Sequence, residues 1–164
     1  MSGLAFLSPV EARGDGVVAP RAVSPLARAL QGADDIQDLS LLGKLEVRGP
    51  VHAIDGGDAD VLPITKERAL VVCDQARVPE LRGSLPGLVL DVTSVLAGIE
   101  VEGLTLMRRL TDLDLGRLPA AGKVADVPAL VAAHGHRYRI FFPQEYGHSV
   151  VEAVRDLQEG VRVE

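Results

Sequence analysis

The stretch that decides the fold is DLSLLGKLEVRG at residues 38–49, which returns as DVTSVLAGIEVEG at residues 91–103 with one inserted residue. In both copies an aspartate is followed two positions later by a hydroxyl residue, and the copy ends in alternating polar and apolar residues. Alternation with a period of two predicts a strand with one buried face. The sequence therefore predicts two similarly built modules that pack on a common core.

An aspartate opens each copy, Asp38 in the first and Asp91 in the second. A short carboxylate in this position favours a turn in which the side chain accepts a hydrogen bond from a nearby backbone N–H. The alternative is a catalytic pair of carboxylates that act on a substrate amine. The structural role is favoured because turn aspartates greatly outnumber catalytic ones.

Hydrophobic periodicity predicts the elements on either side of the repeat. Helices are expected near residues 24–32, 76–81, 104–110 and 144–157, and strands at residues 44–48, 69–73, 87–92, 98–103, 129–133 and 137–142. The last two strands flank His134-Gly135-His136, the pattern of a tight hairpin turn. Tyr146 is expected on the apolar stripe of the last helix, and prolines and a glycine interrupt residues 119–128.

These elements predict an α+β fold in which two similar β/α modules pack on a shared core. We expect an N-terminal arm at residues 1–23, a first module at residues 24–87 and a second at residues 88–164, with both modules in one compact domain. The arm contains glycines and prolines without periodicity, which is typical of a loose segment.

Composition limits the classes of function. The chain has 164 residues, 47% apolar and only 3% aromatic, with no Trp and a net charge of −6. The acidic balance and the absence of a Lys/Arg cluster argue against nucleic acid as a partner. No apolar stretch approaches the roughly 20 residues that span a bilayer. The single cysteine, Cys73, lies in an apolar run and is expected to be a buried thiol in a cytoplasmic protein.

Several short motifs suggest chemistry, but each lacks a necessary part. His134 and His136 have no third ligand nearby in sequence to complete a metal site. Residues 55–60 are acidic but do not have the spacing of a calcium loop. Gly43-Lys44 has no upstream glycine of a phosphate loop, and Arg13-Gly14-Asp15 is expected to be a chance match. The sequence therefore predicts no catalytic, cofactor-binding or metal residue on the chain.

The order of these pieces resembles the gamma subunit of heterotetrameric sarcosine oxidase, which is similar to the folate-binding fold of the glycine-cleavage T-protein (aminomethyltransferase). The resemblance rests on LVLDVTSVLAGIEVEG at residues 88–103 and YRIFFPQEYGHSVVEAVRDL at residues 138–157. The first module contributes DLSLLGKLEVRGP at residues 38–50 and VLPITKERALVVCD at residues 61–74. These motifs and the segments between them cover about four-fifths of the chain.

The resemblance implies a non-catalytic accessory subunit in a complex that oxidises sarcosine to glycine. FAD, FMN, NAD and tetrahydrofolate would then bind to larger flavoprotein subunits, with tetrahydrofolate as the one-carbon acceptor. The isolated chain would be prone to self-association. Two alternatives remain: a small stand-alone folate-binding or aminomethyltransferase-like one-carbon protein, and a stand-alone regulatory or binding domain.

Overall fold

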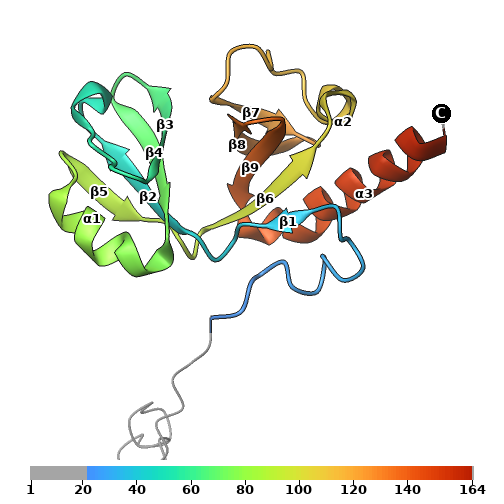
Figure 1. The fold of residues 1–164 in the computed structure, drawn as a ribbon, viewed down its shortest axis with the longest axis horizontal. Coiled ribbons are helices and arrows are strands. Elements are labelled where there is room, and N and C mark those ends of the chain that lie inside the picture. Colours follow the sequence, from blue (N-terminus) through green and yellow to red (C-terminus); the bar gives the residue numbers. More distant parts are fainter. Residues whose placement is uncertain (1–21, 164) are drawn as a thin grey trace, which may run out of the picture.

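The structure, a computed structural model, describes residues 22–163 and consists of two antiparallel sheets side by side (Figure 1). The four-stranded sheet has, in spatial order, β3 (Asp60–Thr65), β4 (Arg68–Cys73), β2 (Gly43–Arg48) and β5 (Leu88–Asp91). The five-stranded sheet has β1 (Gln37–Asp38), β6 (Leu96–Glu102), β9 (Arg137–Pro143), β8 (Val127–His134) and β7 (Ala120–Val124). The α+β class predicted from the sequence is confirmed.

Helices cover one face of each sheet. Helix α1 (Val78–Ser84) packs on the four-stranded sheet, where its Val78 and Leu81 belong to one buried apolar cluster with Leu45 and Val71. Helices α2 (Leu104–Leu110) and α3 (Gly147–Val163) pack on the five-stranded sheet through a larger apolar cluster. Short 3₁₀ turns precede α1 and α3, at Gln75–Arg77 and Gln144–Tyr146, and a third lies at Val51–Ala53. Each sheet therefore has its own apolar cluster between the sheet and the helices that cover it.

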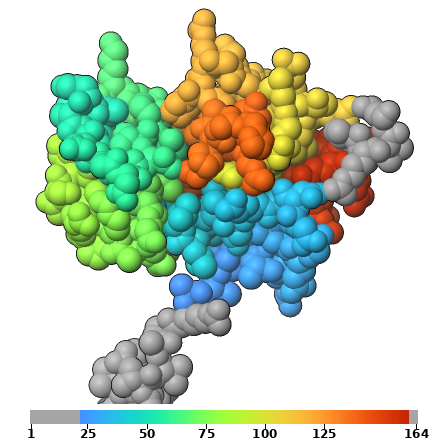
Figure 2. Space-filling view, in the orientation of Figure 1, coloured from blue at the N-terminus to red at the C-terminus, as the bar shows by residue number. Residues whose placement is uncertain are grey.

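The opposite faces of the two sheets meet each other. A third apolar cluster contains Leu62, Leu70 and Val72 from the four-stranded sheet together with Leu130, Ala132 and Phe141 from the five-stranded sheet. In the space-filling view the green first module and the orange part of the second lie in direct contact (Figure 2). We call this contact the seam. It is the shared core that the repeated sequence predicts.

The repeat crosses the seam twice. Strand β1 belongs to the five-stranded sheet, where it pairs with β6, and the chain then crosses over to β2 in the four-stranded sheet. Strand β5 pairs with β2, and the chain crosses back to β6. The predicted division between residues 87 and 88 precedes β5, so sheet membership does not follow it. Each sheet receives an edge strand from the other half, because each repeat spans both sheets.

Most predicted elements are confirmed. The strands expected at 44–48, 69–73, 87–92 and 98–103 correspond to β2, β4, β5 and β6, and the hairpin corresponds to β8 and β9 with Gly135 at φ +61°. The helix expected at 104–110 is α2, and those expected at 76–81 and 144–157 begin later, at Val78 and Gly147, after their 3₁₀ turns. Local periodicity therefore located the elements well.

Some expectations were wrong. Residues 25–32 form successive turns in place of a helix, and Gly32 at φ +74° ends them. Tyr146 is exposed, because the stripe of α3 that faces the core begins at Val150. Strands β3 and β7 were not predicted. Proline in β3 and glycine in β7 are unfavourable in strand interiors, so the sequence did not indicate these strands. Both are edge strands, where proline is tolerated.

Most of the expected N-terminal arm, residues 1–21 with Arg13-Gly14-Asp15, lies outside the described residues. Within residues 22–163, no helix combines the length and the apolar character needed to cross a bilayer.

Candidate functional site at the seam

The two crossovers are built alike. The Oδ1 atom of Asp38 accepts a hydrogen bond from Ser40 N at 2.8 Å, and Oδ1 of Asp91 accepts one from Thr93 N at 3.0 Å. The turn hydrogen bonds predicted for these aspartates are confirmed. The hydroxyls then bind the opposite strand: Lys44 N donates to Thr93 Oγ1 at 3.0 Å, and Gly98 N donates to Ser40 Oγ at 3.3 Å.

Backbone hydrogen bonds extend this symmetry. Leu39 N donates to Gly98 O at 2.8 Å, and Val92 N donates to Lys44 O at 2.9 Å. Lys44 and Gly98 therefore occupy equivalent positions about a pseudo-twofold axis through the seam. Gly98 has no room for a side chain, since an added Cβ would lie 2.8 Å from Cδ1 of Phe141.

Lys44 is fully buried at this axis. Its Nζ donates to Ser40 O at 2.7 Å and to Leu42 O at 2.8 Å, so the ammonium satisfies carbonyls of the first crossover. Burial lowers the pKa of Lys44 to about 8, against the opposing effect of the negative charges of Asp38 and Asp91. Gly43 and Lys44 thus begin strand β2 and do not form a phosphate loop.

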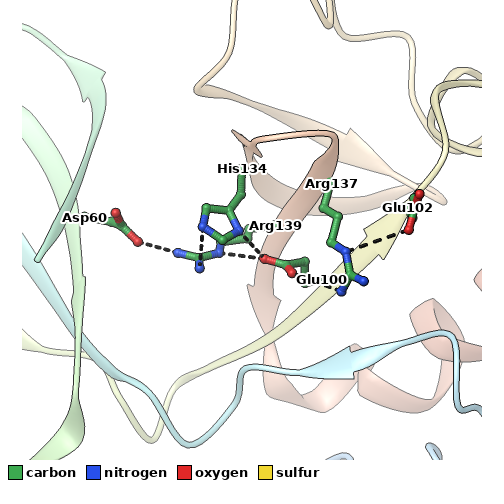
Figure 3. Close-up of polar contacts among 6 residues, drawn as sticks. All are labelled: Asp60, Glu100, Glu102, His134, Arg137 and Arg139. Atoms are coloured by element: carbon green, nitrogen blue, oxygen red, sulfur yellow. Dashed lines mark hydrogen bonds and ion pairs between the residues drawn. The ribbon is translucent and has the colours of Figure 1, made fainter.

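A polar network lies between the sheets, in the part of the seam shown in Figure 3. Arg139 of β9 donates from Nε to Glu100 Oε2 at 2.9 Å and forms an ion pair with Asp60 of β3. Arg137 lies 3.5 Å from the same glutamate and 3.8 Å from Glu102. Glu100 and Glu102 pair directly with Arg139 and Arg137 in the β6–β9 register. We call these residues, with His134, the Glu100 network.

His134 completes the network. Its Nδ1 lies 2.8 Å from Glu100 Oε2, and its Nε2 lies 3.2 Å from Nη2 of Arg139. A guanidinium can only donate hydrogen bonds, so Nε2 accepts and the proton resides on Nδ1, which donates to the glutamate. His134 therefore bridges the two charged groups that pack most deeply in the network.

Glu100 is the buried centre of the network, with a side chain only 5% exposed. Burial raises the pKa of Glu100, but hydrogen bonds from Arg139 and His134 outweigh it and hold the pKa below its usual value. In the four-stranded sheet, burial likewise raises the pKa of Glu46, and hydrogen bonds from Arg68 and Arg48 bring it below its usual value. Both carboxylates are therefore ionised at neutral pH and engaged by guanidinium groups.

The structure separates the residues considered for metal binding. His134 faces Glu100, whereas Nε2 of His136 lies 3.6 Å from Glu102. In the acidic segment at residues 55–60, Asp55 accepts a hydrogen bond from Gly57 N, Asp58 pairs with Arg77 and Asp60 pairs with Arg139. Among the described residues, no three His, Cys, Asp or Glu side chains come together in a metal-binding arrangement.

Cys73 is a buried thiol, as predicted. Burial raises the pKa of Cys73, and the charges of Asp74 and Asp91 raise it further, so the thiol is protonated at neutral pH.

The Glu100 network escaped sequence analysis for a physical reason. Its members sit at the polar positions of alternating strands, which are normally taken as solvent-facing. Here that face is the seam. The one available signal was the matching of Glu100 and Glu102 by Arg137 and Arg139, but it requires the β6–β9 pairing to be known. The network joins β3 to β9 through an ion pair, and both carboxylate oxygens of Glu100 lie close to guanidinium groups.

Comparison with known proteins supports the fold assignment. No protein-family model matches the sequence, and no curated protein matches it either. Among solved structures, the chain is similar to one chain of the heterotetrameric sarcosine oxidase from Corynebacterium sp. U-96, solved in complex with pyrrole 2-carboxylate. The TM-score is 0.68 at 18% identity, and the match covers 82% of this chain and 93% of that chain.

The regulatory subunit of aspartate kinase from Thermus thermophilus, in its ligand-free form, gives a TM-score of 0.48 at 12% identity over 74% of this chain and 95% of that one. The match to the sarcosine oxidase chain confirms the expected resemblance to a sarcosine oxidase subunit at the level of the fold.

Proposed function

We propose that this chain is a non-catalytic accessory subunit, of the gamma type, in a flavoprotein complex that oxidatively demethylates sarcosine to glycine. The observation that carries the proposal is the shared fold over 93% of one chain of heterotetrameric sarcosine oxidase. Coverage of nearly all of that chain means that the similarity is to a complete subunit. The flavins, NAD and tetrahydrofolate would be held by larger partner subunits.

The polar groups of the seam support a structural role. Arg139, Glu100 and His134 bind one another, so their charges are used within the chain. Both aspartates of the crossovers accept backbone hydrogen bonds, and Lys44 is enclosed. These groups hold the two modules together, which suits a scaffold presented to a larger chain.

The outer surface also supports association. Leu88 and Leu90 of β5 are 55% and 36% exposed, and within residues 22–163 β5 is an edge strand that pairs with β2 on one side only. An open edge with exposed leucines favours pairing with another chain. A partner that covers β5 would remove this liability.

The direct test is to purify the tagged chain from its native host, identify the co-purifying chains and record the visible spectrum. The subunit role predicts stoichiometric larger chains and flavin absorbance in the eluate, together with sarcosine-dependent reduction of that flavin. Recovery of the chain alone, with no flavin, would contradict the proposal.

The one-carbon alternative is tested on the chain purified separately from any partner. Binding of tetrahydrofolate to the chain itself would raise its melting temperature, since a ligand at about 100 times its Kd adds roughly 2.7 kcal/mol of stability. An unchanged melting temperature at millimolar tetrahydrofolate favours the accessory role.

A further inference from the structure

The pseudo-twofold axis relates the Glu100 network to a second place on the seam. Glu46 pairs with Leu70 in the β2–β4 register as Glu100 pairs with Arg139 in the β6–β9 register. Leu70 is therefore the counterpart of Arg139. We compared the β3–β4 register with the β8–β9 register in the same way. In this comparison, Leu130 of β8 is the counterpart of Asp60 of β3.

The two equivalent places are filled differently. At one, Arg139 reaches across the seam to Asp60 and the polar network occupies the space. At the second place, the residues equivalent to Arg139 and Asp60 are both leucines, and a groove of about 300 Å³ remains between the sheets. Its walls are mainly apolar and include Leu70, Leu96, Leu130, Phe141 and Phe142, with Glu46 and Arg68 also lining it.

Charge is unbalanced at the polar end of this groove. Glu46 binds two guanidiniums: Arg48 Nε lies 2.7 Å from Oε1, and Arg68 Nη2 lies 3.0 Å from Oε2. Arg48 and Arg68 are direct neighbours across β2 and β4, where like charges repel. At the counterpart, Arg137 and Arg139 are met by three carboxylates within the described residues.

The two guanidiniums bound to Glu46 retain donors for an anion, and of the two Arg68 lines the groove. Glu46 takes Nε and Nη2 of Arg68 and only Nε of Arg48. Within residues 22–160, no hydrogen bond engages Nη1 of Arg68 or either Nη of Arg48. A carboxylate in the groove would accept a hydrogen bond from Nη1 of Arg68 and offset positive charge without displacing Glu46.

We propose that this groove binds a small carboxylic acid with an apolar body, with the carboxylate on Arg68 and the body against Leu96 and Phe141. The volume of about 300 Å³ is at the lower end of small-molecule pockets, which suits a linear chain or a single ring. The binding does not depend on the subunit role proposed above.

The test is a titration of the full chain, followed by NMR shifts of the groove residues, with three eight-carbon probes: octanoate, octylamine and 1-octanol. Octanoate is expected to saturate with a submillimolar Kd. Octylamine is expected to bind at least about tenfold more weakly, because one charge-assisted hydrogen bond contributes that much. Equal affinity for octanoate and octylamine, or no saturable shift with octanoate, would overturn the proposal.

Two variants locate the site. Arg68→Gln is expected to weaken octanoate binding about tenfold while leaving 1-octanol unaffected. Val95→Trp places a bulky ring on an exposed residue of the groove lining and is expected to weaken both probes. The matched control is Arg82→Gln, on the exposed side of α1, which is expected to bind as the unmodified chain does. Unchanged octanoate affinity in both groove variants would show adventitious binding and sink the proposal.

Discussion

Arg139 of β9 and Asp60 of β3 form an ion pair that joins the two sheets across the seam. The pair is asymmetric: the Arg139 side chain is 16% exposed, whereas that of Asp60 is 51% exposed. Each end of this contact therefore makes a different contribution to stability.

We expect Arg139→Met to destabilise the chain by about 3 kcal/mol, because it leaves the buried Glu100 without its main cationic partner. Asp60→Asn removes only a half-exposed charge and is expected to cost at most about 1 kcal/mol. Urea unfolding of both variants measures the difference. Equal losses would show that burial of Glu100 does not govern this network.

Acid should weaken the chain through Glu100. Its pKa in the folded chain lies below the ordinary value of 4.5. The unfolded state therefore takes up protons first, and the stability that the ionised group contributes above pH 4.5 is lost as the pH falls through the lower folded pKa. Melting temperatures from pH 7 to pH 3 should fall less steeply in Glu100→Gln than in the unmodified chain. Parallel curves would contradict the assignment.

Alkali should have the opposite effect through Lys44. Its pKa is about 8 in the folded chain and 10.5 ordinarily, so the unfolded state binds more protons between these values. Stability from this group therefore rises with pH across that window, by on the order of 3 kcal/mol. Urea unfolding at several pH values from 8 to 10 should show this rise, and Lys44→Met should lack it. A variant with the same slope would show that another group is responsible.

Gly98→Ala tests the close approach of β6 to its neighbours at the axis. The added Cβ would meet Phe141 at 2.8 Å and Cβ of Leu39 at 3.2 Å. We expect a loss of about 1–3 kcal/mol, typical of overpacking in a core. Gly83→Ala, where nothing lies within 4 Å of an added Cβ, is the matched control and is expected not to destabilise the chain. Thermal unfolding compares the two.

The open edge of β5 predicts the effect of charge on assembly. Leu88→Lys combined with Leu90→Lys should leave the fold intact, because both side chains are exposed, but should abolish co-purification of the partner chains. Leu104→Lys alters another exposed leucine, on α2, and serves as the control. Retention of the partners by the double variant would place the interface elsewhere.

Sequence reasoning succeeded where structure is local. The alternation of residues 44–48 and 98–103 located β2 and β6, and His134-Gly135-His136 located a hairpin turn. It could not show that β5 pairs with β2 and β1 with β6, since pairing is decided by packing between distant segments. The repeat indicated two modules, but not that each repeat spans both.

The candidate site was harder to predict for a related reason. Lys44, Glu46 and Glu100 occupy polar positions in alternating strands, which normally face water. Lys44 and Glu100 are buried and Glu46 is half-buried because the second sheet covers this face, and only tertiary structure shows it. The turn roles of Asp38 and Asp91 were predictable, because the residues that bind them are two positions away.

The exchange of edge strands makes the chain a covalently joined counterpart of a strand-swapped dimer. A fragment ending after α1 would have no β5 to close its sheet, and one starting at β5 would have no β1. Each half would therefore lack one edge strand of its sheet, and two fragments cut between α1 and β5 can regain this architecture only by recombining. Cutting the backbone at that loop would turn an intramolecular fold into a concentration-dependent association.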